Sequence, residues 1–61
     1  MTWAERIKIS REKLLLTQEE LAKEINVSFA TINRWENAHN EPSAKHKRAL
    51  IAFFKKEKIE C

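Results

Sequence analysis

Apolar residues near the start of the chain recur at the spacing of a helix. Trp3 and Ile7 lie four positions apart, and Leu14 falls near the same stripe. Thr2 precedes this stripe and has a glutamate three residues later, which is the spacing of a capping box. We therefore expect a first helix over about residues 2–14.

The same capping signature opens the next segment. Thr17 is followed three residues later by a glutamate, so a second helix is expected to begin at Gln18. Leu21 and Ile25 then supply its inward face. Asn26 tolerates the left-handed backbone conformation that ends many helices, and it begins a turn of three residues.

A third helix is expected to begin after Ser28, which is a good N-cap, and to end near Asn37. Ile32 and Trp35 lie three positions apart and form its inward face. The residues left nearer the exposed side are Phe29, Ala30, Thr31, Asn33 and Arg34.

Pro42 separates the third helix from the last one. Because proline disfavours a helical conformation at the residue before it, residues 38–42 are expected to form a loop. Ser43 can then cap a last helix over about residues 44–58.

The remaining pattern completes the expected fold. Leu50 and Phe54 form the inward stripe of the last helix. Glycine is absent and no segment alternates between apolar and polar residues, so strands have little support. We expect an all-α fold, a compact four- to five-helix domain that occupies residues 1–61 as a single unit.

The second and third helices carry the strongest indication of function. Two short capped helices joined by a three-residue turn match the geometry that places the second helix in the major groove of DNA. This helix-turn-helix motif covers about residues 17–36. Ala30 and Thr31 are small enough for close approach to base edges, and Arg34 one turn later can reach a guanine or a phosphate.

The sequence also resembles a known family over nearly its whole length. The motifs are LTQEELA at 16–22, INVS at 25–28, INRWEN at 32–37 and EPS at 41–43. Their order and spacing are similar to those of the Cro and Xre family of repressors. This resemblance implies a repressor-like fold and sequence-specific binding of double-stranded DNA by a transcriptional regulator.

The resemblance assigns phosphate contacts to several positions. It implies that Gln18, at the start of the second helix, hydrogen-bonds a phosphate. Asn37 and His39 correspond to positions that contact phosphates in the loop after the third helix. Thr31 and Asn33 correspond to positions closer to the DNA backbone.

Base reading is assigned to the start and middle of the third helix. By resemblance, Phe29, Ala30 and Arg34 occupy base-reading positions, and Ser28 belongs to the same face. An apolar Phe29 has two interpretations from the residues alone: exposed, it can touch thymine methyl groups, and turned inward, it staples the helix to the core.

The family resemblance also implies a structural ion pair. Arg11 and Glu36 match a pair that ties the first helix to the end of the third. The chain departs from the family where many members have glycine, at Leu15, Asn26 and Ala38. Asparagine accepts the same backbone conformation, whereas the other two residues are disfavoured there.

Ser10 is a further departure, because the family usually has an apolar residue at this position on the inner face of the first helix.

Charge and composition narrow the classes of function. The net charge of +3 favours an anionic partner such as DNA. The longest apolar run, 50–54, is far shorter than the roughly 20 residues of a membrane span, and residues 1–6 do not resemble a signal peptide. No membrane association and a cytoplasmic location are expected.

Metal binding and catalysis find little support. His39 and His46 lie seven positions apart across a proline, and Cys61 is the only cysteine, so no metal site, internal disulfide or cofactor is expected. Glu19 and Glu20 are neighbours on a helix, where adjacent side chains diverge by about 100°. We expect no enzymatic activity.

One recognition helix reads only a few base pairs, so a homodimer on DNA is expected, with Ile51, Phe53 and Ile59 as its surface. Trp3 and Trp35 are interpreted as core residues. The alternative function is a protein-interaction module of the antitoxin or coactivator type on the same fold. Steeply salt-dependent binding to duplex DNA distinguishes the two.

Overall fold

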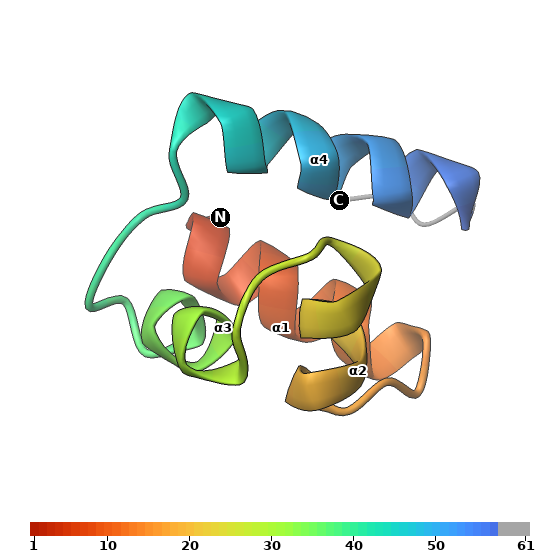
Figure 1. Ribbon diagram of the computed structural model, residues 1–61, viewed down its shortest axis with the longest axis horizontal. Helices are drawn as coiled ribbons and strands as arrows, with labels where there is room; N and C mark the ends of the chain where they lie inside the picture. Colours follow the sequence, from red (N-terminus) through yellow and green to blue (C-terminus); the bar gives the residue numbers. More distant parts are fainter. Residues whose placement is uncertain (58–61) are drawn as a thin grey trace.

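The computed structural model describes residues 1–57, and this part of the chain contains four helices joined by loops (Figure 1). They are α1 (Trp3–Lys13), α2 (Gln18–Glu24), α3 (Phe29–Glu36) and α4 (Ala44–Lys56). Residues 1–57 contain no strand, which confirms the expected all-α class. No helix in this part is long and apolar enough to cross a bilayer.

The expected helix boundaries at α1, at the starts of α2, α3 and α4 and at the end of α3 lie within one residue of the observed ones, and the end of α4 differs more. This helix ends at Lys56, and Glu57 is its C-cap, whose N–H donates to the carbonyl of Phe53 at 3.0 Å. The expected end at residue 58 differs by two positions, and Lys58 itself lies outside the described residues.

A side-chain hydroxyl caps the N-terminus of each described helix. Thr2, Thr17, Ser28 and Ser43 each accept a hydrogen bond from the backbone N–H three residues later. In α1 the backbone N–H of Thr2 donates in return to Glu5, and this bond holds the pKa of that carboxyl below its usual value. Because a cap satisfies N–H groups that the helix leaves unpaired, its loss costs about 1 kcal/mol.

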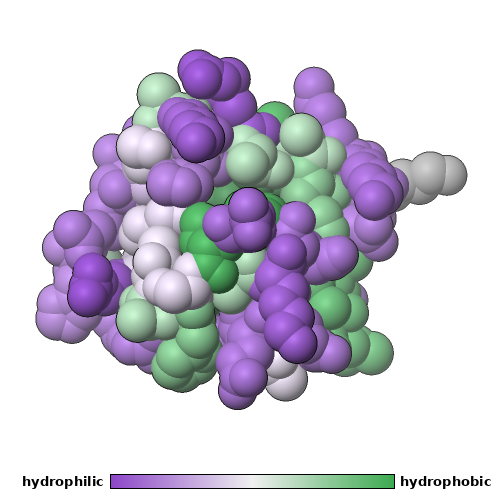
Figure 2. Space-filling view, viewed as in Figure 1, coloured by the Kyte–Doolittle hydropathy of each residue, from purple (hydrophilic) through white to green (hydrophobic). Residues whose placement is uncertain are grey.

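The core collects apolar side chains from all four helices. Its buried members are Ile7, Leu21, Ala22, Ile25, Ile32, Trp35, Leu50 and Phe54. These include the inward positions expected for α2, α3 and α4, whereas Leu14, which is the C-cap of α1, is only half-buried. Ser10, on the inner face of α1, is 1% exposed. Hydrophilic side chains cover most of the face seen in Figure 2, with smaller apolar areas between them.

Aromatic rings hold the first half of α4 against the rest of the fold, on the upper side of α1 in Figure 1. The rings of Trp35 and His46 have centroids 5.3 Å apart at a tilt of 55°. The ring of Trp3 lies 4.2 Å from the guanidinium of Arg6 and 5.6 Å from the amine of Lys47. Trp35 is therefore a core residue as expected, and Trp3 is half-buried and packs against the core.

Three helices end in a left-handed residue that is not glycine. Leu15, Asn26 and Ala38 have φ values of 59°, 60° and 59°. After each of them, the next backbone N–H donates to the carbonyl five residues earlier, at 2.9 to 3.0 Å. This is the Schellman pattern, for which glycine is the usual residue. The expected role of Asn26 is confirmed, and the other two positions adopt the same conformation despite their Cβ atoms.

We expect Leu15→Gly and Ala38→Gly each to stabilise the fold by about 0.5 to 1 kcal/mol. A left-handed residue with a Cβ costs about 1 to 2 kcal/mol, and the extra freedom of glycine in the unfolded chain offsets part of that gain. Both side chains are exposed, so little packing is lost. Thermal melting should show increases of about 3 to 6 °C. Ala52→Gly, inside α4, is the control and should lower stability by about 1 kcal/mol. Equal melting temperatures for all three variants would contradict the strain at these positions.

Candidate nucleic-acid interface

A helix-turn-helix unit is formed by α2, the turn after it and α3. The turn contains Asn26 in its left-handed conformation and ends at Ser28, the N-cap of α3. Ile32 and Trp35 are 0% and 4% exposed, so one side of α3 packs into the core. The opposite side of α3 is left on the surface.

The structure places most of the expected recognition residues on this surface. The exposed ones on α3 and its N-cap are Ser28, Phe29, Ala30 and Arg34. Phe29 is 50% exposed, so the outward interpretation of this side chain is the one observed. Thr31 and Asn33 are half-buried, which is less exposed than their positions on the helix alone suggested. Thr31 is hydrogen-bonded to Ser28, and Asn33 is hydrogen-bonded to Gln18.

The two hydroxyl groups in the first turn of α3 are hydrogen-bonded to each other. Thr31 donates its backbone N–H to the hydroxyl of Ser28 at 3.2 Å. The two hydroxyl oxygens are 2.9 Å apart and share a second hydrogen bond. One of the two O–H donors is therefore used within the cap, and the other remains available to an outside acceptor.

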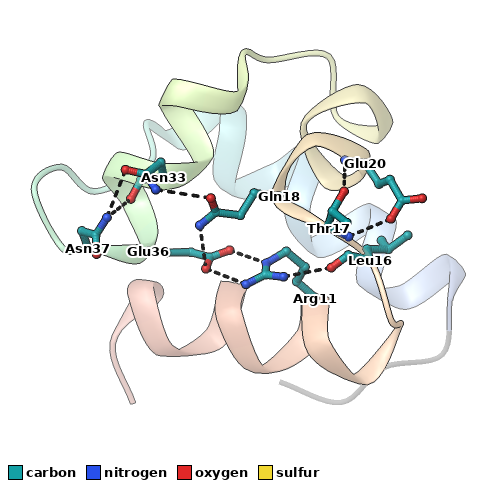
Figure 3. A network of polar contacts seen from close by, with 8 residues as sticks. All are labelled: Arg11, Leu16, Thr17, Gln18, Glu20, Asn33, Glu36 and Asn37. Atoms are coloured by element: carbon teal, nitrogen blue, oxygen red, sulfur yellow. Dashed lines mark hydrogen bonds and ion pairs between the residues drawn. The ribbon is translucent and has the colours of Figure 1, made fainter.

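An ion pair joins α1 to the last residue of α3 (Figure 3). Arg11 Nε donates to Glu36 Oε2 at 2.6 Å, and Arg11 Nη2 donates to Glu36 Oε1 at 3.0 Å. The side chains are 15% and 5% exposed. The hydrogen bond to the carboxylate raises the pKa of Arg11. The expected pair is thus present, and it is partly buried and bidentate.

A chain of three amides extends from this ion pair along α3 (Figure 3). Gln18 Nε2 donates to Glu36 Oε1 at 3.1 Å, and Asn33 Nδ2 donates to Gln18 Oε1 at 3.3 Å. Asn37 Nδ2 donates in turn to Asn33 Oδ1 at 3.1 Å. Because a carboxylate only accepts hydrogen bonds, it sets the orientation of the first amide and, through it, of the next two. We call Gln18, Asn33 and Asn37 the amide chain.

Sequence reasoning missed these links. The amide chain joins residues 15 positions apart, and no local spacing rule relates them. Arg11 Nη1 also donates to the backbone carbonyl of Leu16 at 2.9 Å, which ties α1 to the loop that precedes α2. A guanidinium carries five N–H donors, and the sequence does not indicate which backbone carbonyl any of them will reach.

Two expected contact residues, His39 and Arg34, have exposed side chains that take no part in the amide chain. His39 is exposed in the loop after α3, and its backbone N–H donates to the carbonyl of Arg34. The guanidinium of Arg34 has no hydrogen bond or ion pair within residues 1–57. It is therefore an unpaired cation on the exposed side of α3.

Comparison with known proteins agrees with this geometry. A family model described as helix-turn-helix matches residues 7–59. The chain belongs to the Cro/Xre-type helix-turn-helix family. It is 38% identical over 50 residues to the HTH-type transcriptional regulator DicA of Escherichia coli (strain K12). The match covers 82% of this chain and 37% of that protein, so the chain spans little more than a third of its relative. No solved structure shows a significant match.

Family membership confirms the resemblance drawn from the four sequence motifs. The matched region contains the whole unit from Gln18 to Glu36 and the loop that follows it. The individual contact residues stay predictions, because a family match concerns the fold and not the role of each side chain.

Proposed function

We propose that this chain binds double-stranded DNA sequence-specifically and regulates transcription, with α3 in the major groove. The observation that supports this most is the exposed side of α3, where Arg34 has no protein partner within the described residues. A cation left unpaired on the outward side of such a helix suits a polyanion. The net charge of +3 acts in the same direction.

Roles follow from the exposure and hydrogen bonding of each side chain. Base reading is assigned to Phe29, Ala30 and Arg34, which are exposed and unbonded. The residues that position the unit or contact phosphates are Gln18, Ser28, Thr31, Asn33, Asn37 and His39. An amide nitrogen carries two hydrogens, so Gln18 keeps one for a phosphate after donating to Glu36.

The finer parts of the proposal concern assembly and mode of action. We propose a repressor that occupies its operator in the cytoplasm as a homodimer, since two half-sites give useful specificity. Ile51 is 38% exposed on α4, whereas Phe53 packs against the core. Ile59, the third residue expected at the dimer surface, lies outside the described residues. A palindromic operator would support the homodimer.

Selection from a random pool of duplex DNA tests the function. The chain should enrich one motif. Its affinity for that motif should fall steeply between about 50 and 200 mM salt, as expected for a protein that contacts several phosphates. Absence of binding to any duplex, together with salt-insensitive binding to a protein, would favour the alternative interaction module.

Replacing Gln18 tests its proposed phosphate contact. Gln18→Ala should weaken binding to every duplex by about tenfold, because a hydrogen bond to a charged group is worth about 1.5 kcal/mol. Sequence preference should not change, since phosphates are common to all sequences. Affinities for matched and mismatched duplexes measure this, with circular dichroism to verify the fold. A changed preference at unchanged non-specific affinity would refute the phosphate role.

A further inference from the structure

The first turn of α3 presents an apolar surface where a recognition helix needs to meet bases. Phe29 is 50% exposed, and Ala30 beside it is exposed as well. The hydroxyls of Ser28 and Thr31 lie 2.9 Å apart and share one hydrogen bond, so one of their two O–H donors is used within the cap. The ring of Phe29 makes no ring contact within residues 1–57.

Base edges in the major groove differ in what they offer to such a surface. Guanine, adenine and cytosine present hydrogen-bonding groups there, and thymine adds the one apolar group, its C5-methyl. A phenyl ring placed against a polar edge would exclude water without replacing its hydrogen bonds, which is unfavourable. Against a methyl group the same ring removes apolar area from water on both sides.

The nearest proposed polar reader along α3 is Arg34, which is exposed and lies about 140° around the helix axis from Phe29. It follows Phe29 by five residues, which corresponds to about 7.5 Å along the helix axis. Base pairs are stacked about 3.4 Å apart, so for a helix lying along the groove the two side chains are separated by about two base steps. The unpaired guanidinium of Arg34, exposed on the same helix, also favours a polyanion over the apolar pocket of a protein as the occupant of this surface.

We propose that Phe29 selects thymine through its C5-methyl group, about two base steps from the base that Arg34 reads. This inference rests on the proposed DNA-binding function. It assigns to the operator half-site a thymine that is recognised by shape and apolar contact and not by a hydrogen bond. Ala30 leaves room for the approach, because its side chain is a single methyl group.

Deoxyuridine tests this assignment, because it differs from thymidine only by the missing methyl group. In the duplex obtained by selection, each thymidine of a half-site is replaced in turn. One or two positions should lose about fourfold in affinity, the value of one buried methyl group. Phe29→Ala should bind the thymidine and deoxyuridine duplexes equally at those positions. Ile9→Ala, at an exposed apolar residue on α1, is the control and should keep the wild-type discrimination.

The outcomes separate this inference from the function on which it rests. Failure to bind any duplex would overturn both. Salt-dependent binding with no deoxyuridine-sensitive position, or with equal sensitivity in Phe29→Ala, would overturn the thymine assignment alone. Because Phe29 is half exposed, Phe29→Ala is expected to fold, and Phe29→Gln supplies a second variant. The glutamine variant should lose methyl discrimination as well.

Discussion

Arg11→Met should destabilise the fold by about 3 kcal/mol, the largest effect we expect from a single substitution. The substitution leaves the carboxylate of Glu36, only 5% exposed, with Gln18 as its remaining side-chain donor. It also removes the donor to the carbonyl of Leu16. An uncompensated buried charge costs much more than an exposed pair contributes.

The measurement needs a background that stays folded. A domain of this size has a total stability of roughly 3 to 9 kcal/mol, so the loss is a large part of it. Urea midpoints are therefore compared in the Leu15→Gly, Ala38→Gly background. Glu41→Gln is the matched control: it breaks the pair with Lys47, in which Glu41 is 64% exposed, and should cost less than about 0.5 kcal/mol.

The double variant separates the loss of a favourable pair from the cost of the charge left behind. Arg11→Met with Glu36→Met should recover most of the lost stability, because methionines can fill the site without a buried charge. If Arg11→Met and the Glu41→Gln control have the same urea midpoint, the pair contributes nothing to stability.

Arg34→Ala should remove about 1 to 3 kcal/mol of binding free energy on the selected sequence, the value of a bidentate contact to guanine. Selectivity should relax at one base position per half-site. Affinity for mismatched duplexes should fall far less, because those complexes lack the guanine contact. The guanidinium has no partner to give up within the described residues, so the fold should be unaffected.

Arg34→Lys is the matched variant, because it keeps the charge and loses the planar pair of donors. If Arg34 reads guanine, the lysine variant should discriminate as poorly as the alanine variant while binding mismatched duplexes normally. If Arg34 only neutralises a phosphate, Arg34→Ala should weaken all duplexes equally and reduce the salt slope by about one unit. Titrations at two salt concentrations distinguish these results.

Local hydrogen bonding made the helix boundaries predictable. The caps at Thr2, Thr17 and Ser28 involve atoms only three residues apart, so the residue types and their spacing were sufficient. The ends of the helices were less certain. Asparagine at position 26 indicated a left-handed residue, whereas a leucine at position 15 did not. Leu15 adopts this conformation, with φ of 59°, because the Schellman hydrogen bonds at the end of α1 require it.

The sequence by itself therefore determined the four helices, the inward faces of α2, α3 and α4 and the helix-turn-helix spacing. The tertiary structure decided which polar side chains meet: Asn33 donates to Gln18 across 15 residues, and Phe29 turns outward. The Arg11–Glu36 pair spans 25 residues and was reached through family resemblance, not spacing. Such contacts depend on how the helices cross, and a period of 3.6 residues along one helix carries no information about the angle or register of its neighbour.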